Sequence, residues 1–283
     1  MRKNVLRESL IAGRPTLSTR MVTTSPEIVE IIGLSGQFDF IELCGEYAAW
    51  TLPDLGNFAR AVELFPHMSS MMKVERDPRM FITHRAIGAG IQNINFADCD
   101  SAEEARELVR YVKPLTPEDG GLLGSGMHRN VGYVIEGASV QWVKAMREVV
   151  IEVMIESAGA ADQLDEILSV KGIDMLHFGP GDYSLTVGLV GQKSGPEMKK
   201  KQREVFEKAM KKGVRPRVII NSVEEAKDFF AMGVRDFCVG SDLGTLYRWC
   251  KSNGEKMRKL TYLHKPGLGC NLPWACRSQL ELI

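Results

Sequence analysis

Two acidic residues stand where apolar runs of this chain end in loops of small residues. Glu156 closes the stretch Ile-Glu-Val-Met-Ile-Glu-Ser, and Asp182 lies within His-Phe-Gly-Pro-Gly-Asp-Tyr-Ser. Carboxylate oxygens are the ligands that hard divalent cations prefer, and such ions keep open positions for a substrate. If the runs 151–155 and 173–178 are neighbouring strands of a parallel barrel, both acids lie at its C-terminal rim, where barrel enzymes carry out chemistry. The pair is therefore a candidate metal site.

Strand alternation favours an inward-facing Glu156. Glu152, Met154 and Glu156 share one face of a strand over 149–156, and the opposite face is apolar, as packing against helices requires. A buried carboxylate is costly unless it is paired or bound to a metal. The alternatives are a salt bridge at the rim for Glu156 and a helix cap for Asp182, because Gly-Pro-Gly-Asp is a good turn sequence.

Other polar residues at strand ends could complete such a site. The tetrapeptide Cys-Gly-Glu-Tyr follows an apolar run, so Glu46 and Tyr47 could contact a substrate or a metal-bound water. Tyr47 could equally be a packed aromatic. Lys73 could neutralise an anionic substrate or be a surface lysine, and Gln92, at the start of a strand, could orient a water or a carbonyl. His177, late in a strand, is typical of a hydrogen-bonded core histidine.

Short apolar strands alternate with helical patterns along most of the chain. Eight such repeats predict an α/β protein with a closed (β/α)8 barrel, because strands that alternate with helices form parallel sheets. A doubly wound open sheet is the alternative, but no GxGxxG opens a helix after the first strand. The expected strands are 16–22, 38–43, 70–74, 91–96, 149–155, 173–178, 215–220 and 237–239.

The barrel pattern predicts a single domain over residues 1–260. A Pro/Gly-rich loop and a helix interrupt it at about 113–148, and we expect this insertion to lie above the rim. After residue 260 the pattern stops. The tail 261–283 contains Pro, Gly and an aromatic residue, and it could dock on a neighbouring subunit or fray.

Composition excludes several classes of partner. The 283 residues include 36 Lys+Arg and 36 Asp+Glu, so nothing favours binding to nucleic acid or an anionic membrane. No apolar stretch approaches the ~20 residues of a membrane span, and the N-terminus lacks the apolar segment of a signal peptide. Six cysteines without CxxC spacing indicate a reduced, cytoplasmic protein.

A series of short motifs, taken in order, resembles a known family. The motifs lie at 11–15, 25–30, 38–40, 45–46, 90–92, 101–105, 155–157, 172–174 and 179–184. Over about residues 5–250 the chain is similar to the HpcH/HpaI aldolase family, whose members are metal-dependent class II pyruvate aldolases related to the citrate lyase β subunit and to macrophomate synthase. The resemblance implies a TIM barrel of the phosphoenolpyruvate/pyruvate type, in homo-oligomers (trimers or hexamers) that exchange the last helix.

The resemblance also implies the parts of the site. Mg²⁺, Mn²⁺ or Co²⁺ would bind Glu156 and Asp182, and a 2-oxo acid such as pyruvate would chelate the ion. The ion would act as a Lewis acid that stabilises an enolate. Lys73 occupies the position of a basic side chain that supports the developing charge, and Gln92 a substrate position. The backbone at Gly181 and Asp182 would hold the substrate carboxylate.

The chain departs from the family pattern across the rim. The usual Asp-Gly-Glu-His, whose Asp–His pair moves the proton of the aldol hydroxyl, reads Cys44-Gly45-Glu46-Tyr47 here. Lys73 aligns with the usual third-strand Arg and lacks its bidentate fork, although Arg76 could reach inward instead. A loop Arg of the family corresponds to Leu122 or Leu123. We expect a carbon–carbon lyase in which Tyr47 carries the proton, with Lys73 and Glu46 beside it. The alternatives are a synthase or decarboxylase that needs no Asp–His pair, or a catalytically weak carboxylate-binding relative.

Overall fold

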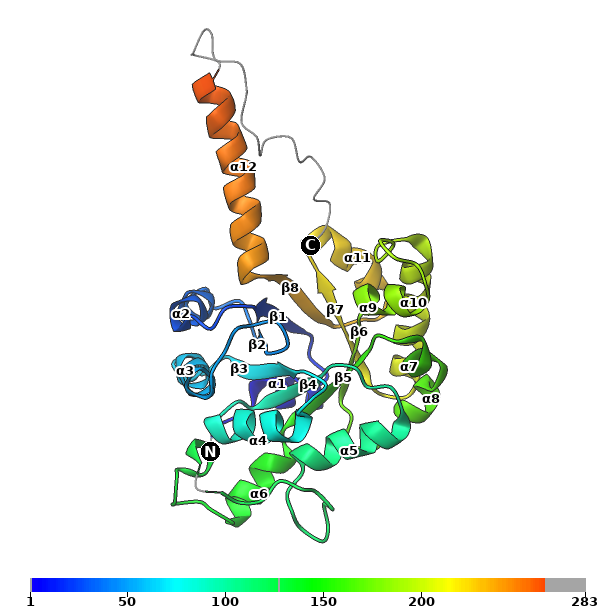
Figure 1. Cartoon of the computed structure of the whole chain (residues 1–283). Helices are drawn as coiled ribbons and strands as arrows, with labels where there is room; N and C mark the ends of the chain where they lie inside the picture. The colour runs from blue at the N-terminus through cyan, green and yellow to red at the C-terminus, as the bar shows by residue number, and fades with distance from the viewer. Residues whose placement is uncertain (1, 127, 263–283) are drawn as a thin grey trace.

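The computed structural model describes residues 2–126 and 128–262 (Figure 1). Eight parallel strands close into a barrel in chain order, with helices on its outer surface, which confirms the (β/α)8 prediction. The strands are β1 (Thr16–Met21), β2 (Phe40–Cys44), β3 (Ser69–Val74), β4 (Asn93–Phe96), β5 (Val150–Ile155), β6 (Met175–Phe178), β7 (Arg215–Ile220) and β8 (Asp236–Ser241).

Most of the helices lie between consecutive strands and cover the barrel with their apolar faces. They are α1 (Val5–Ile11), α2 (Pro26–Leu34), α3 (Leu52–Glu63), α4 (Arg79–Ala89), α5 (Ala102–Val112), α6 (Val140–Arg147), α7 (Ala158–Asp162), α8 (Leu164–Ile167), α9 (Pro180–Thr186), α10 (Pro196–Lys211), α11 (Val223–Met232) and α12 (Asp242–Tyr262), with a 3-10 turn η1 (Arg129–Val131). Within the described ranges no helix is long and apolar enough to cross a membrane.

An apolar layer closes the N-terminal end of the barrel interior. Leu6 of α1 packs there against inward-facing side chains of β2, β3, β5 and β6, all of them fully buried. These side chains are Phe40, Met71, Val150 and Met175. The barrel is therefore a packed core at this end, as is usual for the fold, and α1 acts as its plug.

The next layer towards the rim is ionic. Arg217 of β7, fully buried, donates from Nε to Glu152 of β5 at 2.9 Å and forms an ion pair with Glu42 of β2. Asn95 of β4 donates to Glu42 at 3.1 Å. His177 lies beside them, with Nδ1 at 3.1 Å from the Arg217 carbonyl oxygen. Burial, and then the charge of Arg217, lower the pKa of His177 to about 3, so it is a neutral core histidine, as the sequence indicates.

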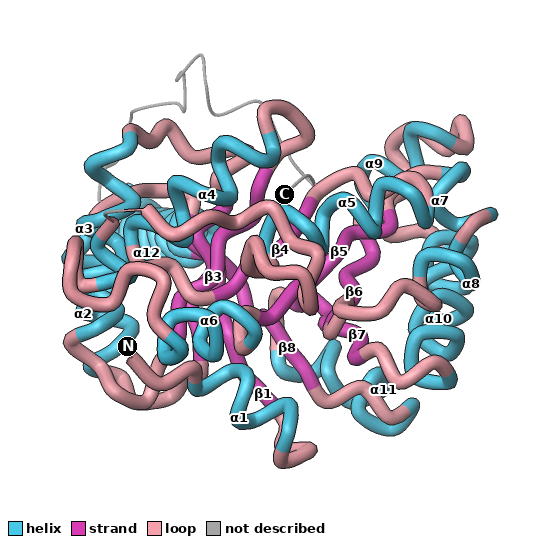
Figure 2. The backbone as a smooth tube through the Cα atoms, turned by 90° about the horizontal axis from the view of Figure 1, so that it is seen from below, coloured by secondary structure: helices cyan, strands magenta, loops and turns pink. Residues whose placement is uncertain are grey.

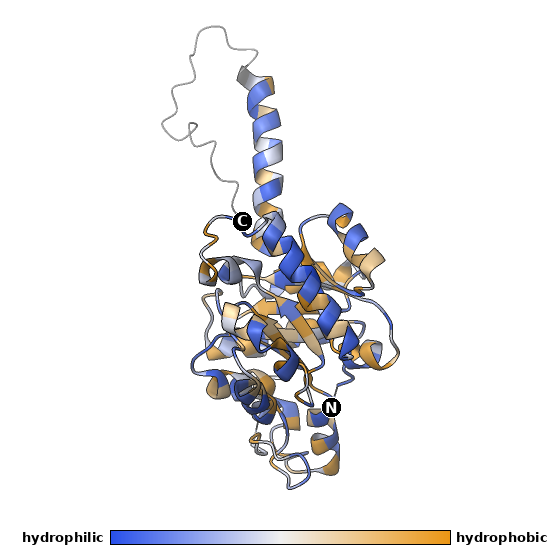
Figure 3. Cartoon of the chain, turned by 90° about the vertical axis from the view of Figure 1, so that its right-hand side faces the viewer, coloured by the Kyte–Doolittle hydropathy of each residue, from blue (hydrophilic) through white to orange (hydrophobic). Residues whose placement is uncertain are grey.

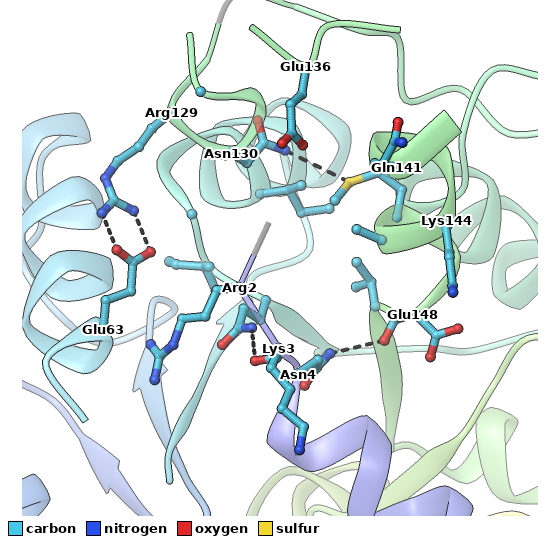
Figure 4. A pocket seen from close by; sticks show the side chains of 18 of the residues that line it. Arg2, Lys3, Asn4, Glu63, Arg129, Asn130, Glu136, Gln141, Lys144 and Glu148 are labelled. Atoms are coloured by element: carbon cyan, nitrogen blue, oxygen red, sulfur yellow. Dashed lines mark hydrogen bonds and ion pairs between the residues drawn. The ribbon is translucent and has the colours of Figure 1, made fainter. Parts of the chain in front are cut away.

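The segment 113–148 lies at the N-terminal end of the strands, so the expected position above the rim is wrong. The chain leaves α5 here and must return to the start of β5, and helix-to-strand connections lie at that end of a barrel. Figure 2 shows α6 beside α1, which closes the same end. Arg129 of this segment pairs with Glu63 at the end of α3, beside a cavity of about 1120 Å³ (Figure 4).

Helix α12 projects from the barrel and contacts strands only near its start, at β1 and β8 (Figures 1 and 3). At 1.5 Å per residue, its 21 residues span about 31 Å. Large apolar side chains on α12 are more than half exposed, namely Leu246, Trp249, Met257 and Leu260. The tail expected at 261–283 lies outside the described residues, except for the last two residues of this helix.

The buried ion set generates a stability prediction. Replacing Arg217 by Met should lower the free energy of unfolding by about 3–5 kcal/mol, because Glu42 and Glu152 would lose the cation that compensates them. Urea unfolding followed by circular dichroism measures this loss. Arg203→Met is the control, since that guanidinium is exposed on α10 and its pairing with Asp228 is loose, at 3.5 Å. Equal changes in the two variants would contradict the importance of the buried set.

Candidate active site

Glu156 is the first residue after β5, and its side chain is buried at the C-terminal end of the barrel. One carboxylate oxygen, Oε1, accepts the backbone N–H of Asp98 at 2.8 Å. The other, Oε2, is buried and has no hydrogen-bond partner among the described residues. Burial raises the pKa of Glu156 to about 7, against the attraction of Lys73 and the Asp98 N–H. Such an orphaned oxygen is uncommon, and it fits a cation ligand better than a rim salt bridge.

The loop after β4 holds the donor for Glu156 in place. Asp98 has a φ of 51°, in the left-handed region that is uncommon for non-glycine residues, although Asp adopts it more readily than most. Arg79 of α4 donates to the Asp98 carbonyl at 2.7 Å and so stabilises this loop, and it also pairs with Glu104 of α5. Glu104 in turn accepts the N–H of Asp100 at 2.8 Å. Two helices outside the barrel thus orient the carboxylate inside it.

The turn from β6 into α9 passes directly against Glu156. A Cβ atom on Gly179 would lie 2.6 Å from Glu156 Oε2, so only glycine fits there while the carboxylate keeps its position. Asp182 follows in the first turn of α9, with its side chain exposed. The space around Gly181 is open, with no atom within 4 Å of a Cβ placed there. The structure therefore brings Glu156 and Asp182 to the same rim, on neighbouring strands.

Lys73 lies across the barrel mouth on β3 and is not a surface lysine. Its side chain is 5% exposed, forms an ion pair with Glu46, and places Nζ 4.9 Å from the centroid of the Tyr47 ring. Burial opposes its charge, but Glu156, Tyr47 and Glu46 outweigh burial and raise the pKa of Lys73 above its usual value. Lys73 therefore supplies a permanent positive charge beside Glu156.

Two groups at the positions of the family's Asp and His hold their protons. Burial, reinforced by Glu46 and Asp182 and opposed by Lys73, raises the pKa of Tyr47 to about 12, although 57% of the residue's surface is exposed. Cys44 ends β2 and is fully buried, and burial raises the pKa of its thiol to about 12. Tyr47 therefore carries its phenolic proton at neutral pH.

Gln92 lies away from this site. It precedes β4, so it sits at the N-terminal end of the strands, where its Nε2 donates to the Lys3 carbonyl at 2.9 Å and it lines the cavity of Figure 4. Its expected place in the substrate site is therefore wrong, because residues at the start of a strand lie at the opposite end of the barrel from the rim. Asp98, which sequence reasoning missed, does reach the rim. It follows the apolar run 91–96 just as Glu156 follows 151–155, and that signal could have found it.

A closed barrel with carboxylates and a charged lysine at its C-terminal rim defines a TIM-barrel enzyme. Residues 52–248 match the family model described as HpcH/HpaI aldolase/citrate lyase. The chain is 27% identical over 256 residues to 4-hydroxy-2-oxovalerate aldolase of Novosphingobium aromaticivorans, covering 90% of this chain and 94% of that protein. It is also 27% identical over 244 residues to 5-keto-4-deoxy-D-glucarate aldolase of Shigella dysenteriae serotype 1, covering 85% and 91%.

A solved structure shares the fold: the HpcH/HpaI aldolase from Desulfitobacterium hafniense DCB-2 gives a TM-score of 0.81 at 23% identity, covering 93% of this chain and 98% of that one. The family match covers more than half of the sequence. The chain belongs to the HpcH/HpaI aldolase/citrate lyase family. It is an enzyme, a lyase of the aldolase type, as the motif series indicates.

The contact between Gly179 and Glu156 can be tested directly. Gly179→Ala should lower the free energy of unfolding by about 1–3 kcal/mol, because the added methyl group would overlap the carboxylate and force a shift in a packed region. Gly181→Ala is the matched control, two residues away in open space, and should change stability by less than about 1 kcal/mol. Chemical unfolding of both variants measures the difference. Similar stabilities of the two variants would show that Glu156 moves away from the added methyl group without loss of stability.

Proposed function

We propose that the protein is a divalent-metal-dependent lyase that breaks or forms a carbon–carbon bond beside a 2-oxo acid such as pyruvate. The observation that carries this proposal is the buried Glu156, whose Oε2 has no partner among the described residues, across the mouth from the charged Lys73. An aldolase is favoured over a synthase or a decarboxylase because the relatives described above are named as aldolases.

We assign the metal to Glu156 and Asp182. Their oxygen donors suit Mg²⁺ or Mn²⁺, which bind few carboxylates and keep water or substrate oxygens as further ligands. In residues 2–126 and 128–262 no three His, Cys, Asp or Glu side chains are grouped to hold a metal ion, so this proposal involves a two-carboxylate seat. When bound, the ion would supply Lewis-acid stabilisation of the negative charge that develops on the 2-oxo acid.

Lys73 and the α9 turn position the substrate in this proposal. Lys73 lies where its ammonium can attract an anionic substrate, and Glu46 holds that ammonium in place. The open backbone at Gly181 and Asp182 leaves room for the substrate carboxylate. Fixed charges in a partly buried site stabilise a developing anion without the reorganisation that water requires.

Tyr47 is the proton carrier in this proposal. In the condensation direction the carbonyl oxygen of the aldehyde becomes an alkoxide as the carbon–carbon bond forms, and the Tyr47 hydroxyl donates a proton to it. Lys73, at 4.9 Å from the ring, would stabilise the resulting phenolate. In the cleavage direction Tyr47 must first lose its own proton to solvent, and its phenolate then accepts the proton of the aldol hydroxyl. Its raised pKa suits it to be the acid of the condensation and makes it a poor resting base.

The experiment for the proposed function follows the methyl protons of pyruvate. Protein supplied with Mn²⁺ should exchange them with D₂O, because exchange reports enolate formation without an electrophile, and NMR measures the rate. Glu156→Gln should abolish exchange and weaken Mn²⁺ binding at least 100-fold by calorimetry, whereas Glu103→Gln, on the exposed face of α5, should change neither. No exchange and no Mn²⁺ binding by the unmodified protein would overturn the proposal.

Tyr47→Phe separates proton transfer from metal binding. The variant should bind Mn²⁺ like the parent but turn over aldol substrates about 100-fold more slowly or worse, the usual contribution of a general acid. Tyr133→Phe, also an exposed tyrosine but in the segment 113–148, is the control. Unchanged turnover in Tyr47→Phe would dismiss this residue as the proton carrier.

We also propose a homo-oligomer, a trimer or hexamer, built through α12. Leu246, Trp249, Met257 and Leu260 recur at helical spacing and form one apolar face, which the protein's own barrel leaves uncovered. The occupant that this face fits is a second copy of the chain. The last helix of that copy also projects away, so its barrel can pack against this face. Apolar faces of this length rarely remain in water.

The oligomer can be tested by placing charged residues on the apolar face of α12. Leu246→Glu with Trp249→Glu should convert the assembly to monomers, because burying two unpaired carboxylates in an apolar interface is costly. Lys251→Glu, exposed on the opposite side of the same helix, should leave the mass unchanged. Light scattering coupled to size-exclusion chromatography measures the mass, and a parent protein that is already monomeric would contradict the proposal.

A cytoplasmic location is proposed from the cysteines. Cys44, Cys99, Cys238 and Cys250 are free thiols, and the first three are buried. Free thiols are typical of reducing compartments.

A further inference from the structure

A buried arginine lies behind the loop that binds Glu156. Arg79 is the first residue of α4, outside the barrel, and its side chain is 7% exposed. Its Nη2 donates to the carbonyl oxygen of Ala97 and, at 2.7 Å, to that of Asp98. One guanidinium nitrogen therefore binds two consecutive peptide groups of the loop that follows β4.

The peptide group between Ala97 and Asp98 joins this arginine to the carboxylate. In a trans peptide the C=O and the N–H point in opposite directions within one rigid plane. The oxygen of this group accepts from Arg79, and its N–H donates to Glu156 Oε1 at 2.8 Å. Because the plane is rigid, the arginine determines the direction from which the N–H meets the carboxylate. A charged donor on the oxygen also polarises the peptide and strengthens the bond that its N–H makes.

The arginine and its loop are themselves held in place. Glu104 of α5 pairs with the other terminal nitrogen of Arg79 and accepts the backbone N–H of Asp100 at 2.8 Å. The hydroxyl of Ser157, the residue that follows Glu156, donates to the Asp100 carboxylate. The loop is therefore attached to the end of β5 at two places, and Arg79 and Glu104 support it from behind.

Orientation and charge predict opposite effects of Arg79 on a cation bound at Glu156. A carboxylate that is fixed through Oε1 presents its unpartnered Oε2 in a constant direction. Groups that orient a metal ligand typically change metal affinity 10- to 100-fold. The positive charge of Arg79, however, repels a cation. Removing Arg79 therefore weakens metal binding if its role is orientation, and strengthens binding if only its charge matters.

We propose that Arg79 is a positioning residue that increases the affinity of the site for its divalent metal, although it lies outside the barrel and carries a charge of the same sign as the ion. It acts through the peptide group of Ala97 and Asp98, which turns the Glu156 carboxylate towards the barrel mouth. This inference rests on the proposed function for the assignment of the metal to Glu156.

The test measures Mn²⁺ binding by calorimetry. Arg79→Met should weaken binding about 10-fold or more, and Arg79→Lys should recover part of the loss, because an ammonium can still donate to the loop carbonyls. Arg76→Met is the charge control. Arg76 acts on Asp98 by its charge, is 56% exposed and pairs with the Asp100 carboxylate. This variant should bind Mn²⁺ at least as tightly as the parent. Binding by Arg79→Met that equals or exceeds that of the parent would overturn the assignment.

A measurement on the metal-free protein keeps this inference separate from the proposed function. Hydrogen exchange of the Asp98 amide, followed by NMR, reports the bond to Glu156 without metal or turnover. Arg79→Met should exchange this amide about 10-fold faster or more, and Arg76→Met at the parent's rate, with thermal melting showing that both variants fold. Equal rates in the parent and Arg79→Met would overturn the role of Arg79. Absence of Mn²⁺ binding by the unmodified protein would instead overturn the proposed function.

Discussion

A single guanidinium pairs with two carboxylates in the middle of the barrel. Arg217 binds Glu152 and Glu42, and Asn95 supports Glu42, so that one polar layer joins β2, β4, β5 and β7. An apolar layer of the same volume would serve stability equally well or better, because desolvating charges is expensive. What the ionic layer adds is a fixed arrangement, since each strand must keep the register that presents its polar side chain to the others.

The strand positions fixed by the ionic layer also determine where the groups of the C-terminal rim lie. Glu46 and Tyr47 follow β2, Asp98 follows β4, and Glu156 follows β5, so three of the strands tied by Arg217 carry groups of the rim. Support also comes from outside, because Arg79 and Glu104 on two surface helices fix the loop whose N–H binds Glu156. The ionic layer beneath the rim and the helices α4 and α5 outside the barrel therefore both hold the site in place. Burial keeps Tyr47 protonated, whereas Lys73 stays charged against burial because Glu156, Tyr47 and Glu46 raise its pKa.

The sequence was enough to predict the barrel and the placement of Glu156 and Asp182 at the same end of it, because both depend on a simple rule: residues that follow parallel strands share one edge. The two incorrect predictions, for Gln92 and for the segment 113–148, did not follow this rule. Gln92 precedes its strand and the segment 113–148 follows a helix, so both lie at the opposite end. The protonation of Tyr47 and the unpaired Oε2 of Glu156 depend on which side chains surround them in space, and no local pattern in the sequence carries that information.

The close approach of Gly179 to Glu156 has an evolutionary consequence. A side chain cannot be added at position 179 while Glu156 keeps its position, since a Cβ would lie 2.6 Å from the carboxylate oxygen and 2.7 Å from the Glu156 Cβ. Shortening the acid would not make room, because every residue except glycine keeps that Cβ, so the turn into α9 must shift when the glycine is replaced. Among descendants of a common ancestor, a larger residue after the sixth strand would mark lineages in which this turn has moved relative to the carboxylate, and with it the chemistry that the carboxylate serves.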